Sequence, residues 1–175
     1  MKIVKVRNVK TPSIGTTNSI GIDFFVPEFD DKFMDDFFVI NPLENATLYH
    51  TRNDDGSYYS TIRVFPHSIV KIPSGIHIRI EDNQALMFND KSSIATKRGL
   101  TKVAGIVDSD YKEEIMFVLL NYTNKEVSIE QNEKIIQGII TTKVVNEVYE
   151  FTDLNTLYEG MNSNRTGGFG STGKF

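Results

Sequence analysis

The chain consists largely of short runs of alternating or β-branched apolar residues, which Gly, Pro, Asn and Asp separate. Such alternation puts apolar side chains on one face of an extended segment and is typical of strands, whereas a helix needs a longer run with a period of about 3.6. The runs occupy residues 2–7, 62–65, 69–72, 76–80, 115–120, 135–145 and 148–151. The sequence therefore predicts an all-β protein, a compact β-barrel or jelly roll.

Turn signals support this prediction. Asn-Asp-Asp-Gly at residues 53–56 lies between the runs 47–52 and 58–64 and predicts a hairpin, and Pro-Ser-Gly at residues 73–75 predicts a turn. The pattern favours one short helix, over residues 92–97. Gly99 follows it as a stop signal.

Residues 28 to about 60 differ from the rest of the chain. Four aspartates, at positions 30, 31, 35 and 36, are interleaved with phenylalanines at positions 29, 33, 37 and 38. The spacing lacks the glycine and terminal glutamate of a calcium loop. We interpret the segment as an insertion with a solvated acidic face over an aromatic core, and the role that we assign to it is the binding of a protein partner.

The C-terminal segment is rich in glycine. Four glycines between positions 167 and 173 allow backbone amides to approach an anion, Ser171 and Thr172 add donors, and Phe169 offers a flat face. Alone, such a segment is most often a functionless terminus. We predict a barrel domain over residues 1–160, including the insertion, and a flexible arm over residues 161–175 that orders over a ligand.

Composition excludes several classes of protein. A net charge of −4 argues against a protein that binds the nucleic-acid backbone, and no apolar stretch is long enough to cross a membrane. The chain has no cysteine, and the first residues lack the apolar core of a signal peptide, so we expect an intracellular, cytoplasmic protein. The three histidines, at positions 50, 67 and 77, are too scattered to form a metal site.

Asp108 and Asp110 are the strongest candidates for chemistry. They lie two residues apart in an extended segment, so their carboxylates are expected on one side and Ser109 on the other. Ile106 and Val107 would partly desolvate Asp108, which makes a carboxylate a better acceptor for a proton from water. An isolated Asp-x-Asp pair, however, more often belongs to an ordinary turn.

Five segments in order resemble the motifs of the trimeric deoxyuridine triphosphatase (dUTPase) family. They are SIGIDF at 19–24, KSSIATKRGL at 91–100, GIVDSDYKEEI at 105–115, NEKIIQ at 132–137 and RTGGFGSTG at 165–173. The third and fifth are the most specific. The resemblance implies a jelly-roll-like β-barrel, a homotrimer, and hydrolysis of dUTP to dUMP and pyrophosphate, which limits uracil in DNA and supplies dUMP for dTMP synthesis.

The resemblance also implies the role of each residue in the third motif. Asp108 would be the general base that activates a water for attack on the α-phosphorus. Tyr111 would lie against the deoxyribose and leave no room for a 2′-hydroxyl. Backbone groups of Gly105, Ile106 and Met116 would read the uracil.

The remaining motifs would bind the phosphates. By the resemblance, Lys91, Ser92, Ser93 and Gln137 would contact the phosphate chain. From the arm, Arg165, Gly170, Ser171 and Thr172 would hold the γ-phosphate and Phe169 would stack on the base. Mg²⁺ would be held by phosphates and water with no direct protein ligand, and Asp23 would contact a metal-bound water or orient Lys91.

Three features depart from the family pattern. Lys91 stands where the family usually has an arginine that binds in bidentate fashion. Arg165 lies one residue nearer to Phe169 than in the commonest spacing, and the insertion at 28–60 exceeds the usual connection.

Two other functions are compatible with parts of the pattern. A dCTP deaminase shares the barrel and a motif similar to residues 91–94, but it needs a glutamate where this chain has Val118. A regulatory nucleotide sensor is the second alternative. A sensor could dispense with a general base, whereas Asp108 and Tyr111 are both present.

Overall fold

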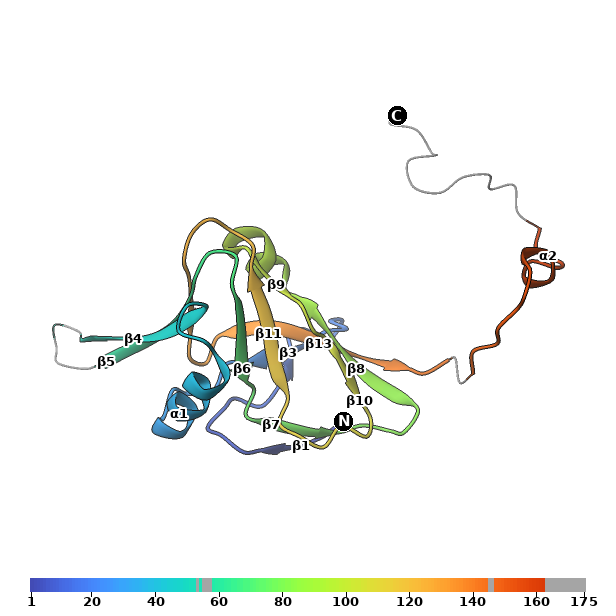
Figure 1. The fold of residues 1–175 in the computed structure, drawn as a ribbon. Helices are drawn as coiled ribbons and strands as arrows, with labels where there is room; N and C mark the ends of the chain where they lie inside the picture. Colours follow the sequence, from blue (N-terminus) through green and yellow to red (C-terminus); the bar gives the residue numbers. More distant parts are fainter. Residues whose placement is uncertain (53, 55–57, 145–146, 163–175) are drawn as a thin grey trace. The chain divides into compact units, whose positions relative to one another are not determined.

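The computed structural model describes residues 1–52, 54, 58–144 and 147–162. Contacts divide the chain into a unit of Met1–Lys143 and a unit of Val144–Phe175. The sequence-based boundary, at residue 160, lies further along the chain than this division. All of the sheets belong to the first unit (Figure 1).

Four antiparallel sheets build the first unit. The largest has the order β10 (Ile106–Asp108), β8 (Gln84–Asp90), β13 (Lys134–Thr142), β3 (Ile22–Phe25) and β2 (Ser13–Ile14). The second is β6 (Ile69–Pro73), β11 (Met116–Asn121) and β9 (Leu100–Lys102), the third is β12 (Val127–Glu130), β5 (Tyr58–Val64) and β4 (Ala46–Arg52), and the fourth is β1 (Lys2–Lys5) with β7 (Ile76–Arg79). The prediction of a mainly β protein is therefore confirmed.

Three phenylalanines lie at the centre of the core. Phe24 meets the ring of Phe88 at 5.0 Å and that of Phe117 at 6.2 Å, and Phe88 meets Phe117 at 5.6 Å, all edge to face. They come from β3, β8 and β11, so the contacts join the largest sheet to the sheet of β6, β11 and β9. Each ring is almost completely buried. Such aromatic pairs stabilise a core beyond the area that they bury.

The insertion contains a helix that the sequence pattern did not predict. Helix α1 (Asp31–Ile40) begins after Asp30, whose side chain accepts a hydrogen bond from the amide of Phe33 at 2.8 Å. Phe33 and Phe37, one turn apart, are buried, so the predicted aromatic core is present although its backbone is helical. At the end of α1 the side chain of Asn41 bonds both the amide and the carbonyl of Lys71 in β6.

Other local predictions have mixed outcomes. The hairpin is confirmed, because β4 pairs with β5 from Ala46 opposite Val64 to Arg52 opposite Tyr58. The short helix is confirmed over residues 92–98, with the π-helical turn η1 at Ile94–Arg98, and Gly99 ends it at φ 72°. The predicted strand at 148–151 is wrong: these residues are exposed and have no partner strand in the described part of the chain, so nothing fixes them as a strand.

Among its described residues, 144 and 147–162, the second unit contains one short helix. Helix α2 (Leu154–Leu157) is capped by Asp153, whose carboxylate accepts from the amide of Thr156 at 2.9 Å. The described residues thus contain three short helical segments where one was predicted. No helix among the described residues is long and apolar enough to span a bilayer.

Candidate active site

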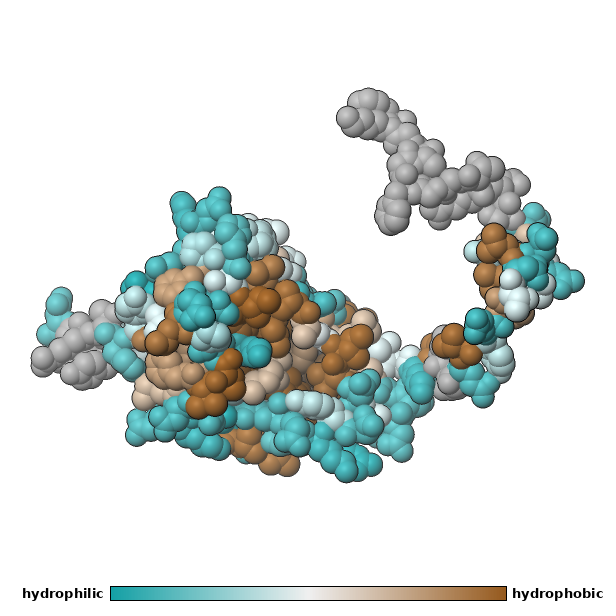
Figure 2. All heavy atoms as spheres, viewed as in Figure 1, coloured by the Kyte–Doolittle hydropathy of each residue, from teal (hydrophilic) through white to brown (hydrophobic). Residues whose placement is uncertain are grey.

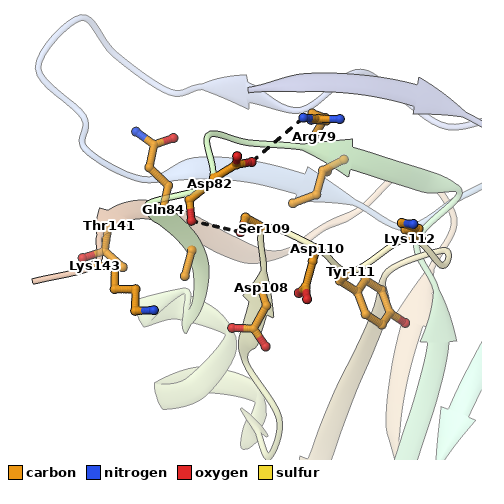
Figure 3. A pocket seen from close by; sticks show the side chains of 12 residues that line it. Arg79, Asp82, Gln84, Asp108, Ser109, Asp110, Tyr111, Lys112, Thr141 and Lys143 are labelled. Carbon is orange, nitrogen blue, oxygen red and sulfur yellow. Dashed lines mark hydrogen bonds and ion pairs between the residues drawn. The ribbon is translucent and has the colours of Figure 1, made fainter. Parts of the chain in front are cut away.

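Strand β10 delivers Asp108 to the rim of a cleft of about 1050 Å³ (Figure 3). A tight turn follows the strand, with the amide of Tyr111 bonded to the carbonyl of Asp108 at 3.2 Å. The side chain of Ser109 donates a hydrogen bond to the carbonyl of Asp82 at 3.3 Å. The cleft is lined by Ile78, Arg79, Asp82, Gln84, Ala85, Asp108, Ser109, Asp110, Tyr111, Lys112, Thr141 and Lys143.

The turn arranges the two acids as predicted. Asp108 and Asp110 project to the same side in Figure 3, while Ser109 points toward Asp82. The predicted desolvation of Asp108 is wrong for the single chain, since Asp108 is exposed and its neighbour Ile106 is 68% exposed. Within the described residues nothing covers the carboxylate.

Tyr111 borders the same cleft. The residue is 40% exposed, and its hydroxyl donates to the carbonyl of Glu114 at 3.3 Å. The cleft also gathers cations from Arg79, Lys112 and Lys143, which the sequence pattern did not single out because they come from three distant segments. The arrangement offers a carboxylate, an aromatic face and positive charge to one ligand.

Backbone edges next to this turn lack a partner. In the described residues β10 has only β8 beside it, with Ile106 opposite Met87. Met116 at the start of β11 pairs with Pro73 of β6, and β9 reaches β11 only from Leu119 onward. The two strands that flank the turn therefore each leave peptide groups available for hydrogen bonds to a ligand.

A second group of predicted residues surrounds Asp23. This side chain is buried, with 6% of its surface exposed, and it forms ion pairs with Lys91 and, at 3.0 Å, with Lys134. Burial alone would raise the pKa of Asp23, but hydrogen bonds and charge from the two lysines outweigh it, and the pKa is lowered. The predicted orientation of Lys91 by Asp23 is present. Lys134 lies inside the fourth motif and was not singled out.

Gln137 extends this cluster. It stands opposite Asp23 in the ladder of β13 and β3, and its amide nitrogen donates to the carbonyl of Asp90 at 2.9 Å. Ser92 and Ser93 follow Lys91 and are exposed. The cluster thus combines ammonium, hydroxyl and carboxamide donors, which suit an anion such as a phosphate.

The two groups lie far apart in one chain. Asp108 pairs with Ala85 near the start of β8, whereas Lys91 follows Asp90 at the strand's other end. Six residues of extended chain separate positions 85 and 91, which corresponds to about 20 Å. Asp108 and Lys91 of one chain therefore cannot contact the same phosphate group.

The remaining predicted contacts belong to residues of the arm. Arg165, Phe169, Gly170, Ser171 and Thr172 lie outside the described residues.

The described residues also bear on Mg²⁺. Within them, no group of three or more His, Asp or Glu side chains is placed to hold a metal ion. Both oxygens of Asp23 are engaged by lysines. Mg²⁺ held by substrate phosphates and water, as the resemblance implies, stays a prediction.

Comparison with known proteins agrees with this geometry. The family model described as dUTPase matches residues 57–173. The deoxyuridine 5′-triphosphate nucleotidohydrolase of Lactococcus lactis is 32% identical, over 78% of this chain and 96% of the relative. The enzyme of the same name from Hydrogenobaculum sp. is 29% identical, over 93% of this chain and 89% of the relative.

Solved structures share the fold at lower identity. The dUTPase of Staphylococcus bacteriophage 80alpha with dUPNHPP has a TM-score of 0.70 and 15% identity, and the match covers 98% of this chain and 97% of that one. The dUTPase of Streptococcus mutans has a TM-score of 0.59 and 18% identity, over 85% of this chain and all of that one. By its sequence match and its architecture, this chain belongs to the dUTPase family.

Proposed function

We propose that the protein is a Mg²⁺-dependent dUTP diphosphatase that hydrolyses dUTP to dUMP and pyrophosphate. The observation that carries the proposal is the turn after β10, which brings Asp108 and Tyr111 to one cleft within the segment matched by the dUTPase family. A dCTP deaminase would need a glutamate at position 118, where this chain has valine, so the deaminase is disfavoured. A sensor without turnover would not need the carboxylate of Asp108.

Asp108 is proposed as the general base. Its carboxylate takes a proton from a water molecule, the water oxygen forms a bond to the α-phosphorus, and the bond from that phosphorus to the bridging oxygen breaks. Pyrophosphate leaves with the electron pair. Positioned bases of this kind commonly contribute about 10²–10⁴-fold to the rate. Bound Mg²⁺ would supply positive charge that stabilises the phosphates.

The base and sugar are proposed to bind beside the same turn. Backbone groups of Gly105, Ile106 and Met116 would form hydrogen bonds with the edge of uracil. The carbonyl of Gly105 already accepts from the amide of Phe88 at 2.6 Å, so Ile106 and Met116 supply the edges that have no partner strand among the described residues. Tyr111 is placed to pack against the sugar and to exclude a 2′-hydroxyl sterically. Selection by backbone groups would explain why few side chains in the sequence point to uracil.

The phosphates are assigned to the second group. Lys91, Ser92, Ser93 and Gln137 would bind the phosphate chain, with Asp23 holding Lys91 in place. The arm, with Arg165, Ser171, Thr172 and the backbone of Gly170, would close over the γ-phosphate, and Phe169 would stack on the base. Closure would exclude bulk water and strengthen each charge contact.

The distance between the two groups supports a homotrimer with shared sites. If Asp108 of one copy faces Lys91 of another, both can act on one substrate, and the neighbouring copy can cover the exposed Asp108. Exposed apolar residues support such a contact: Ile106 and Met87 are cross-strand neighbours that are 68% and 40% exposed. Figure 2 shows apolar surface on the unit of Met1–Lys143 that such a contact could bury.

In the cell, the reaction would limit uracil incorporation into DNA and supply dUMP for dTMP synthesis. An intracellular location would suit this role and the absence of cysteine. A protein partner for residues 28–60 stays a prediction.

A substrate panel in labelled water tests the function. The protein is incubated with dUTP, UTP, dTTP or dCTP and Mg²⁺ in heavy-oxygen water, and the release of pyrophosphate and ammonia is measured. We expect pyrophosphate from dUTP alone at a high rate, with the label in dUMP. Label in pyrophosphate would refute attack on the α-phosphorus, and ammonia from dCTP would favour the deaminase.

A further inference from the structure

We propose that Glu114 is a positioning residue for the Tyr111 segment, and that Arg7 and Asp36 hold it in place. The proposal deepens the function above and rests on the assigned contact of Tyr111 with the sugar. It concerns residues 109–114, which follow Asp108 at the end of β10 and lead to Ile115, the residue before β11. These residues carry the sugar contact, so their placement sets both specificity and rate.

The contact between Arg7 and Glu114 is bidentate. Nε of Arg7 lies 2.7 Å from Oε1 of Glu114, and Nη2 lies 2.9 Å from Oε2. The amide of Gly75 also donates to Oε1, at 2.6 Å. The Arg7 side chain is only 5% exposed and that of Glu114 17% exposed, so water screens the pair weakly. Paired forks of this kind fix direction as well as distance.

Glu114 connects this contact to Tyr111 through its own backbone. The hydroxyl of Tyr111 donates to the backbone carbonyl of Glu114. The same residue therefore binds Arg7 through its carboxylate and Tyr111 through its carbonyl. The segment is also held at Lys112, whose carbonyl lies 2.8 Å from Nδ1 of His77, and at Ser109, which donates to the carbonyl of Asp82. Lys112 is thus tied to β7 and Glu114 to the start of the chain, while Tyr111, next to Lys112, stays 40% exposed.

Helix α1 completes the clamp from the insertion. Nη2 of Arg7 lies 2.6 Å from Oδ2 of Asp36, and the guanidinium lies 6.0 Å from the ring centre of Phe33. Nη1 of Arg7 is buried and has no hydrogen-bond partner among the described residues. The positive charge of Arg7 is therefore balanced by the carboxylates of Glu114 and Asp36. Helix α1 lies outside the residues matched by the family model, 57–173. The insertion therefore contributes directly to the placement of the Tyr111 segment.

Amide exchange and nucleotide selectivity test the clamp together. Glu114→Gln removes the negative charge that Arg7 holds but keeps an acceptor for Gly75. We expect backbone exchange in residues 109–114 to rise about tenfold, while the end of β11 is unchanged. We expect the ratio of kcat/KM for dUTP over UTP to fall about tenfold, because small displacements of positioning groups have large effects on rate.

Substitutions in the helix provide a milder variant and a matched control. Asp36→Asn should change exchange and selectivity in the same direction but less, since the Asp36 side chain is 44% exposed. Asp35→Asn alters an exposed neighbour on the same helix and should change neither. In the double variant Glu114→Gln/Asp36→Asn, the second substitution should change exchange and selectivity less than it does in the parent, because both carboxylates act through Arg7.

Two results would overturn the proposal. One is parental exchange in residues 109–114 of folded Glu114→Gln protein. The other is a parallel loss of activity toward dUTP and UTP with no change in their ratio. The exchange measurement needs no turnover, so it tests the clamp even if the parent protein fails to hydrolyse dUTP, a failure that would count against the proposed function instead.

Discussion

Gly21 lies so close to Gln137 that a β-carbon at position 21 would stand 2.4 Å from Oε1 of the glutamine. Gly21→Ala should therefore displace the carboxamide and leave the β-ladder in place. We expect KM for dUTP to rise about tenfold, which corresponds to the loss of about 1.5 kcal/mol from one hydrogen bond to a charged group. Steady-state kinetics would measure the rise in KM, and thermal melting would show whether the β-ladder is intact.

Gly15→Ala is the matched control for this substitution. A β-carbon at position 15 would meet its nearest atom, Oγ of Ser19, at an ordinary 3.7 Å. We expect near-parental KM and stability. An equal rise of KM in both variants would show that the effect of Gly21→Ala does not pass through Gln137.

The lowered pKa of Asp23 predicts a pH dependence of stability. A carboxylate with a lowered pKa in the folded state stabilises the protein above its ordinary value of 3.8, and this contribution is lost as the pH falls through the lowered value. Asp23→Asn should lower the free energy of unfolding near neutral pH by about 1.5–3 kcal/mol, because Lys91 and Lys134 lose their charged partner.

Urea unfolding across the acidic range would measure this difference. Below the ordinary value, the parent should lose stability more steeply than Asp23→Asn, so that the two curves converge. Asp82→Asn is the control, because Asp82 is 95% exposed and lies 3.9 Å from Arg79 in a surface ion pair. Parallel curves for the parent and Asp23→Asn would contradict the assigned shift.

Mixed oligomers test whether sites are shared between copies. Asp108→Asn should bind dUTP but lose about 10²–10⁴-fold in turnover, and Lys91→Ala should weaken phosphate binding. If each site takes Asp108 and Lys91 from different copies, random mixing of the two variants in a trimer should make about a quarter of the sites intact. Activity of the mixture well above that of either variant is the expected result.

A second mixture controls for trivial rescue. Asp108 and Tyr111 border the same cleft of one chain, so a mixture of Asp108→Asn with Tyr111→Ala cannot assemble an intact site. Equal recovery in both mixtures, or none in the first, would contradict a site shared in this way.

The sequence predicted the parts of the fold that depend on local pattern. Alternation located most strands, and Asn-Asp-Asp-Gly located the hairpin of β4 and β5. Helix α1 was missed, although Asp30 as a cap and the four-residue spacing of Phe33 and Phe37 were usable signals. In this segment four aspartates alternate irregularly with four phenylalanines, so the helical period of the buried residues is hard to recognise, and helix propensity alone is a weak guide.

The site was predictable only in part, because much of it depends on contacts between distant segments. The motif residues Asp23 and Lys91 meet as the sequence suggested. The clamp of Arg7 on Glu114 joins residues 107 positions apart, and no local pattern announces such a pair. The exposure of Asp108 is also nonlocal, since among the described residues β10 has only β8 beside it and no other segment covers the face of Ile106 and Asp108.

Gly99→Ala should destabilise the protein for two separable reasons. Gly99 ends η1 at φ 72°, a conformation that costs other residues about 1–2 kcal/mol. A β-carbon there would also stand 2.0 Å from Cγ2 of Thr123. Gly160→Ala shares the first cost, at φ 77°, but its β-carbon would have no atom of a described residue within 4 Å, so it should have much the smaller effect on the free energy of unfolding.

A double variant separates the clash from the backbone strain. Thr123→Ser removes Cγ2 and keeps the hydroxyl that bonds Oδ1 of Asn121 at 2.8 Å. In the Gly99→Ala background, Thr123→Ser should restore part of the lost stability, so that only the cost of the left-handed backbone remains. In the parent, the same substitution should destabilise the protein slightly. Urea unfolding of the four proteins gives the coupling energy directly. Additive effects would show that Thr123 yields without strain and that the left-handed backbone alone requires glycine at position 99.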